Sequence, residues 1–177
     1  MKTRLSLVAA ATLMAVAHGA SAAPTAAGTQ ITNKATATYN DSTGTKTVES
    51  NTVVTTVQLV ASLTLSAGTA KNAGANTQVS YPHTITNTGN GADTFNLSQT
   101  SSGTLTFTGV QFFLDADGDG QADNATPITN TGSLPAGGTF KFVAVATLPA
   151  GATTGTTNAM IVKATSATTA SVSAQAT

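Results

Sequence analysis

The residues best suited to chemistry lie in one short segment, Asp115-Ala-Asp117-Gly-Asp119-Gly-Gln-Ala-Asp123, which holds four of the seven acidic residues of the chain. Carboxylates at alternate positions repel one another unless a cation lies between them. Oxygens spaced in this way around glycine turns suit Ca²⁺, which takes about six to eight hard oxygen ligands. We therefore predict a calcium site in this segment, residues 115–123, which we call the acidic loop.

The predicted ligands are four carboxylates and one main-chain carbonyl. They come from Asp115, Asp117, Asp119, Asp123 and Gln121, with Asp123 acting directly or through a water molecule. Gly120 stands where an EF-hand-type loop makes its sharp turn, but position twelve is Thr126, so the bidentate Glu of a true EF-hand is missing. We expect weak binding, with a dissociation constant of roughly 10⁻⁴–10⁻³ M. The alternative is a solvated Asp-Gly hairpin turn without an ion.

Other candidates for catalysis are weak. His83 is the only histidine after residue 18, and with no Cys and a single Glu, Glu49, the chain offers few ligands for a transition metal. We expect His83 to pack or hydrogen-bond within a sheet. A Ser-His-Asp arrangement lacks a nucleophile-elbow motif, and no glycine-rich phosphate loop is present. A carboxylate pair for glycoside hydrolysis would have to use aspartates that an ion explains better. The sequence thus favours a protein that is not an enzyme.

The first residues are typical of an export signal. Lys2 and Arg4 form a charged start, residues 5–17 an apolar stretch, and residues 20–22 (Ala-Ser-Ala) a small-residue cleavage site. Cleavage after Ala22 would leave residues 23–177 as the mature chain. We therefore predict an exported protein, located at the cell surface or in the periplasm or extracellular space.

The composition of residues 23–177 excludes some classes of partner. Five lysines stand against seven acidic residues and no arginine remains, so the basic stripe that a nucleic-acid-binding protein needs is missing. No segment after the signal is apolar over the ~20 residues that a membrane-spanning helix requires. Because cysteine is absent, the chain must fold around a core without disulfides.

Apolar residues and turn residues predict strands throughout the chain. Threonine, 37 of 177 residues, is β-branched and suits the exposed face of a strand. Residues 29–60 predict a hairpin turning at residues 40–44; because two strands alone are marginally stable, it must pack on the following domain or on a partner. From residue 62, short alternating strands predict an antiparallel sandwich, with its core near the six phenylalanines between residues 95 and 142. Pro82 inside a strand predicts an edge strand or a bulge.

Several stretches resemble one known family. Val79-Ser-Tyr-Pro-His-Thr-Ile-Thr-Asn-Thr-Gly-Asn-Gly-Ala-Asp-Thr-Phe95 resembles the repeat domain of bacterial envelope and S-layer-type surface proteins, an immunoglobulin-like module of unknown biochemical function. Residues 110–120, the Pro/Gly turns at 134–138 and 148–151, and the stretches at 27–39 and 50–53 resemble it as well. The chain departs from larger members in carrying one repeat and no obvious wall-anchoring or S-layer-anchoring domain.

Together these observations predict an all-β chain, an immunoglobulin-like antiparallel β-sandwich with an additional N-terminal β-hairpin. Its expected parts are the signal peptide (1–22), a hairpin segment packed on the main domain (23–60), the sandwich with its acidic loop (61–167) and a flexible tail (168–177). The expected function is structural: a calcium-stabilised module of the bacterial cell envelope, in a surface-layer or adhesive assembly with other envelope proteins. The hairpin, or an edge strand near Pro82, would pair with a partner's sheet. The alternatives are a sandwich that binds a carbohydrate or another ligand and, with less support, a hydrolase.

Overall fold

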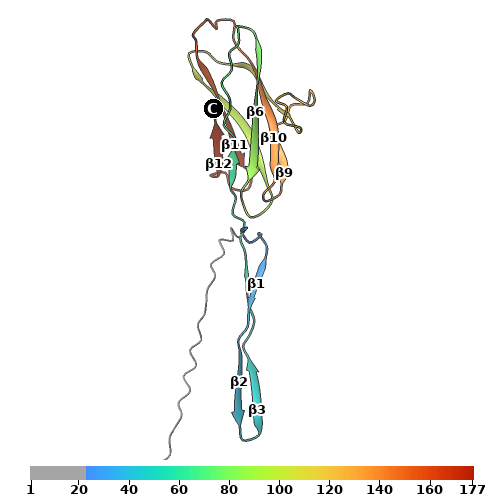
Figure 1. Ribbon diagram of the computed structural model, residues 1–177. Coiled ribbons are helices and arrows are strands. Elements are labelled where there is room, and N and C mark those ends of the chain that lie inside the picture. The colour runs from blue at the N-terminus through green and yellow to red at the C-terminus, as the bar shows by residue number, and fades with distance from the viewer. Residues whose placement is uncertain (1–22) are drawn as a thin grey trace, which may run out of the picture.

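The computed structural model describes residues 23–177, so the signal peptide predicted for residues 1–22 lies outside the described residues. Within this range the chain forms antiparallel strands and no helix, which confirms the predicted all-β class. Figure 1 shows two regions along one long axis, a sandwich of two sheets and a narrow ribbon that projects from one end of it. No helix of the described part is long and apolar enough to cross a membrane.

The sandwich consists of two four-stranded antiparallel sheets. The first has the order β5-β6-β10-β8, with β5 at Leu63–Leu65, β6 at Gln78–Asn87, β10 at Thr139–Thr147 and β8 at Thr108–Leu114. The second has the order β12-β11-β7-β9, with β12 at Ser173–Ala176, β11 at Asn158–Ser166, β7 at Asp93–Gly103 and β9 at Asn130–Leu134. The edge strands β5 and β12 are the shortest of their sheets and lie on the same flank of the sandwich.

The core fills the space between the sheets because successive side chains of a strand point to opposite faces. The inward positions of the long central strands are buried: Phe142, Ala144 and Ala146 in β10, and Met160, Val162 and Ala164 in β11. Phe95 from β7 is fully buried as well, and burying a side chain of this size stabilises the fold by roughly 1.5–3 kcal/mol. The predicted position of the core, among the phenylalanines of residues 95–142, is correct only in part. Four of these six side chains are buried, but β6, the end of β10 and β11 supply core residues outside that range.

The ribbon (residues 28–57) is a pair of antiparallel strands in two stretches. Near the sandwich β1 (Gln30–Asn33) pairs with β4 (Val53–Thr56), and further out β2 (Thr36–Asp41) pairs with β3 (Gly44–Glu49). The tip turns at Asp41, whose carboxylate accepts a hydrogen bond from the backbone N–H of Thr43 at 2.7 Å, and at Gly44, whose φ of 115° favours glycine. The predicted hairpin and its turn are thus present.

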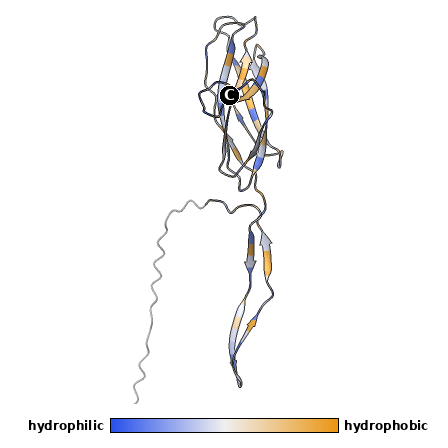
Figure 2. Ribbon diagram, turned by 90° about the vertical axis from the view of Figure 1, so that its right-hand side faces the viewer, coloured by the Kyte–Doolittle hydropathy of each residue, from blue (hydrophilic) through white to orange (hydrophobic). Residues whose placement is uncertain are grey.

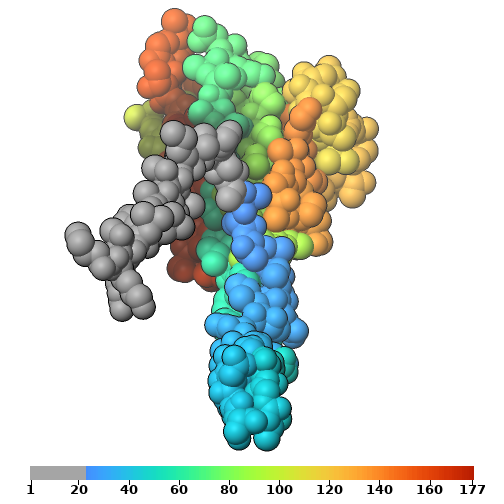
Figure 3. Space-filling model, turned by 60° about the horizontal axis from the view of Figure 1, so that its bottom comes forward, coloured from blue at the N-terminus to red at the C-terminus, as the bar shows by residue number. Residues whose placement is uncertain are grey.

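The expectation that this hairpin packs on the main domain is wrong. Every residue of its four strands is exposed, and the ribbon extends away from the sandwich (Figures 1 and 2). The two sheets of the sandwich cover each other's inner faces, so its core forms without the ribbon. In Figure 3, which looks toward this end, the ribbon and the lobe that contains the acidic loop leave the body in different directions.

The expected flexible tail at residues 168–177 is also corrected by the structure. Residues Ser173–Ala176 form β12, which pairs with Val162–Thr165 of β11, and Ala176 is only 7% exposed. Its inward residues are alanines, which carry too little apolar area to stand out in a stretch of Ala, Ser and Thr. The strand therefore forms because it pairs with β11, and its own sequence is not hydrophobic enough to predict it.

Pro82 lies within β6, at a position that explains how a strand tolerates it. The backbone groups of Thr84 face the β5 side, where its carbonyl accepts a hydrogen bond from the Ser66 N–H at 2.9 Å. Because these directions alternate along a strand, the nitrogen of Pro82 faces the same side. Within residues 23–177 no strand pairs with residues 78–83 on that side, so the missing N–H leaves no gap in a ladder. The predicted edge character applies to this half of β6.

Candidate functional site

The acidic loop leaves the end of β8 and is organised by hydrogen bonds from its own backbone to its carboxylates. Asp115 is only 1% exposed, and its two oxygens accept from the N–H groups of Gly118 at 2.9 Å and Gly120 at 3.1 Å. Asp123 closes the loop by accepting from the N–H of Ala116 at 2.8 Å. The φ angles of Gly118 (81°) and Gly120 (82°) lie in the region that favours glycine, so the sequence of the loop determines its turns.

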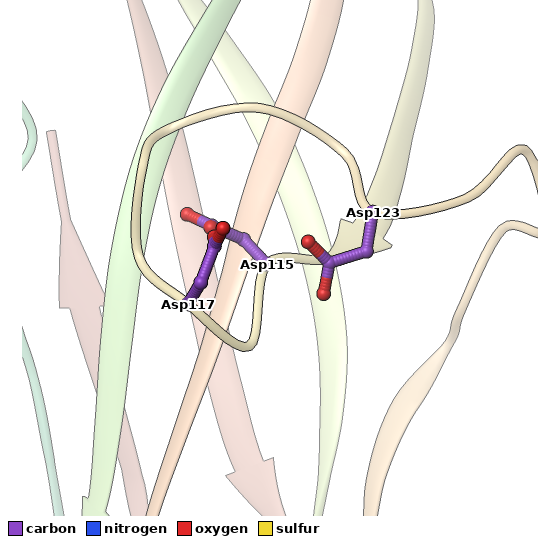
Figure 4. Close-up of side chains that lie close together, drawn as sticks. All are labelled: Asp115, Asp117 and Asp123. Carbon is purple, nitrogen blue, oxygen red and sulfur yellow. The ribbon is translucent and has the colours of Figure 1, made fainter.

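Three of the four loop aspartates come together. Asp115, Asp117 and Asp123 each place a carboxylate oxygen within 4.8 Å of the others, and Figure 4 shows these side chains directed toward one another inside the loop. Asp119 is not part of this cluster. Its carboxylate accepts from the backbone N–H of Gln121 at 2.8 Å and from the side-chain Nε2 of Gln121 at 3.3 Å. Asp119 therefore helps to shape the turn.

The surroundings of the cluster suit a hard cation. The nearby ammonium of Lys141 donates to the carbonyl of Asp117 at 3.2 Å, and within residues 23–177 no ion pair joins a lysine to these carboxylates. The donors are carboxylate oxygens, the ligands that Ca²⁺ prefers, and each carboxylate that accepts an N–H bond keeps lone pairs for a metal. The residues present thus fit a hard cation such as Ca²⁺, which Asp115, Asp117 and Asp123 could hold with one carboxylate oxygen each.

His83 has the environment of a core residue. It is 4% exposed, its ring stacks on Phe142 with centroids 5.5 Å apart, and its Nδ1 lies 3.2 Å from the carbonyl oxygen of Ser66. Because a carbonyl can only accept, Nδ1 carries the proton. Burial lowers the pKa of His83 below its usual 6.5, and the Ser66 bond offsets part of that effect. This is the packed, hydrogen-bonded histidine that the sequence predicted.

The other buried acid, Asp93, is held by hydroxyl and backbone donors. Its carboxylate accepts from the Ser166 hydroxyl and from the Thr94 N–H, which lies 2.7 Å away. Burial raises the pKa of Asp93, but the hydrogen bonds from Ser166, Thr168 and Thr94 together lower it below its usual value. These contacts tie β7 to the end of β11, which is a structural role.

A cavity opens on the flank of the sandwich that carries β5 and β12, at the end far from the ribbon. Its volume is about 800 Å³, and its apolar lining includes Tyr81, Leu105, Phe107, Leu148 and Met160. Lys71 lies over the Tyr81 ring, 5.9 Å from its centroid. Residues 68–75, which form no strand, make one wall. Sequence reasoning missed this cavity, because its residues come from five distant segments.

Asn90 joins the ribbon to the sandwich, a role that the sequence did not indicate. Its side-chain oxygen accepts from the Val60 N–H at 2.7 Å, and its nitrogen donates to the carbonyls of Gln58 at 3.0 Å and Thr25 at 3.1 Å. Its own carbonyl accepts from the Ala27 N–H at 2.9 Å. One buried side chain thus ties both ends of the ribbon to the same point.

Comparisons with protein-family models, with curated proteins and with solved structures found no match for this chain.

Proposed function

We propose that this protein is a non-enzymatic structural subunit of a bacterial cell-envelope assembly, and that its ribbon is the part that contacts neighbouring molecules. The single observation behind this proposal is the full exposure of the ribbon, whose apolar residues include Ile31 at 55%, Val53 at 56% and Tyr39 at 51% exposed. A two-stranded ribbon is marginally stable in water. Cover from other molecules would supply the burial that its own chain does not.

The outer half of the ribbon has two chemically different faces. Register places Ala37 beside Val48 and Tyr39 beside Lys46, and the alternation of a strand puts these residues on one face. The other face carries threonines, including the facing pair Thr38 and Thr47. The face with Ala37, Tyr39 and Val48 is the more apolar of the two although it also carries Lys46. Such a difference between faces is typical of a sheet that is covered on one side. In this ribbon, the side to be covered carries Tyr39 and Val48.

The acidic loop would contribute by stabilising the sandwich. Ca²⁺ held by Asp115, Asp117 and Asp123 would offset the repulsion among these carboxylates and fix the long connection from β8 to β9. Such an ion stabilises the folded state wherever free calcium exceeds the dissociation constant. The export signal predicted at residues 1–22 and the resemblance to the immunoglobulin-like repeat of envelope and S-layer-type proteins support the assignment to the cell surface.

A pair of matched double variants tests this proposal in cells. Changing Tyr39 and Val48 to Asp should release most of the protein from the envelope fraction, because the apolar face then carries charge. Changing Thr38 and Thr45 to Asp adds the same charge to the opposite face, at two positions that are diagonal to each other like Tyr39 and Val48, and should leave the protein in that fraction. The melting temperature of each purified variant reports whether the sandwich is intact. Equal retention of both variants would contradict the proposal.

A carbohydrate- or ligand-binding sandwich is the second candidate, and the cavity is the observation that favours it. The cavity combines a concave apolar surface with a few polar groups, among them Lys71 and Asn158. Tyr81 and Phe107 contact each other edge to face there, with ring centroids 6.4 Å apart. Calorimetric titration with oligosaccharides from the envelope, repeated on Tyr81→Ala, would detect binding in this cavity.

A further inference from the structure

The flank with the cavity is where both sheets are incomplete. β12 pairs with Val162–Thr165 of β11, but within residues 23–177 no strand pairs with residues 158–161 on that side. In the facing sheet, β5 pairs with residues 85–87 of β6 and leaves residues 78–83 without a neighbouring strand. The cavity lies between these two uncovered half-strands. We call this region the open flank.

Only one of the two edges can accept a new strand. The Pro82 nitrogen faces the open flank from β6 and has no hydrogen to donate. In β11, the Ser166 N–H donates toward the β12 side, to the carbonyl of Val172 at 2.9 Å. Because these directions alternate, the N–H and C=O of Met160 also face that side. The accepting edge is therefore the half-strand at residues 158–161.

The interior beside this edge borders the cavity, which Met160 lines. The Met160 side chain points inward, and opposite it in register is Ser101 of β7. Within the described residues, the buried oxygens Ser101 Oγ and Gln99 Oε1 have no hydrogen-bond partner. Buried polar atoms are seldom left unpaired in a completed core. A further strand here would extend the core beyond the end of β12.

The ribbon offers a strand of suitable length and chemistry. β4 is four residues long, as is the uncovered stretch at residues 158–161, and each spans roughly 13 Å at ~3.3 Å per residue. The edge of β4 that faces away from β1 pairs with no strand within residues 23–177. Neither β4 nor β1 carries a charge, so both can be buried without removing an ion from water. Val53 and Ile31 lie on the same face of this pair.

We propose that the ribbon of one copy docks on the open flank of the next copy, an inference that rests on the proposed function. There β4 lies alongside residues 158–161 of β11, in line with β12, and its Val53 face turns toward the cavity. The occupant is a second copy because one chain carries both the unpaired strand and the uncovered edge. β4 lies at the base of the ribbon, at one end of the sandwich, and the open flank lies toward the other end of the sandwich (Figure 1). Two different surfaces therefore meet, so the contact is head-to-tail and repeats into a linear polymer.

Cysteine cross-linking of the mature chain, residues 23–177, tests the arrangement against a background without native cysteine. Val54 and Ile161 lie on the faces that point away from the cavity. A Val54→Cys copy mixed with an Ile161→Cys copy under mild oxidation should give a disulfide-linked heterodimer, identified by mass spectrometry. Replacing the second partner with Asn96→Cys, exposed on β7, should reduce the yield at least tenfold. Predominant Val54–Val54 dimers would show ribbons pairing with each other and would overturn the proposal.

Charged substitutions in β4 give an independent test, in which light scattering of concentrated protein measures the fraction of oligomers. Val53→Asp should lower the fraction of oligomers at least tenfold, whereas Val54→Asp, on the opposite face, should lower it less. A chain that stays monomeric at all concentrations would overturn the head-to-tail contact. If the chain is monomeric but the double variant with Asp at Tyr39 and Val48 is still lost from the envelope fraction, the proposed function stands and the ribbon has a different partner. If that variant stays in the fraction, both proposals fall.

Discussion

The sandwich and the ribbon are built from similar residues, yet one buries its apolar side chains and the other leaves them exposed. In the sandwich two sheets cover each other, so Phe142 and Val162 are completely buried. In the ribbon two strands have no facing layer, so Val53 and Val54 remain more than half exposed. Folding of one chain is sufficient for the first region. The second region would obtain comparable burial only against another molecule, which is why we propose that the function lies there.

Truncating one aromatic residue in each region gives the largest expected contrast. Phe142→Ala removes a fully buried side chain and should lower the free energy of unfolding by about 3–5 kcal/mol. Tyr39→Ala removes an exposed one and should change it by less than about 0.5 kcal/mol in dilute protein. Urea denaturation followed by circular dichroism measures both. A loss of similar size in Tyr39→Ala would mean that the ribbon is packed in the isolated chain.

Asn90→Ala should separate the two regions while leaving each one folded. The change removes three side-chain hydrogen bonds at the joint and leaves the Val60 N–H without an acceptor, at a cost of about 1–3 kcal/mol. Amide exchange at Val60 should accelerate by one to two orders of magnitude, because each loss of about 1.4 kcal/mol in protection corresponds to a tenfold change in rate. The control is Asn96→Ala, an exposed position on β7. Unchanged protection of Val60 in Asn90→Ala would remove Asn90 from this role.

How far the sequence predicted each region depends on the range of the interactions involved. Alternation is local, so the strands, the phenylalanine part of the core and the ribbon's turn could be predicted. The chemistry of the acidic loop was also local, but which aspartates converge depends on backbone turns, and Asp119 bonds Gln121 rather than joining the cluster. The packing of the hairpin, the strand β12 and the cavity depend on contacts between distant segments. No local pattern distinguishes an alanine-rich strand such as Ser173–Ala176 from a tail.

Calcium should stabilise the sandwich and leave the ribbon unchanged. For a dissociation constant of roughly 10⁻⁴–10⁻³ M, 1 mM Ca²⁺ adds about 0.4–1.4 kcal/mol to the free energy of unfolding. Asp117→Asn and Asp123→Asn should abolish most of the resulting shift in melting temperature. Asp119→Asn should retain a larger part of it, because Asp119 lies outside the three-carboxylate cluster. Calorimetry with and without a chelator measures the shift for all three variants. A shift that survives both Asp117→Asn and Asp123→Asn would mean that the ion binds outside the three-carboxylate cluster.

Mild acid should weaken the sandwich through His83. Because burial lowers the pKa of His83 in the folded protein, the unfolded chain takes up this proton more readily. The stability that the neutral ring provides is complete above the unfolded pKa of about 6.5 and declines as pH falls below it, by at most about 1.4 kcal/mol per pH unit for one proton. His83→Gln should flatten this decline between pH 7.5 and 5.5. An equal slope in wild type and His83→Gln would show that another group in the folded protein titrates over this range.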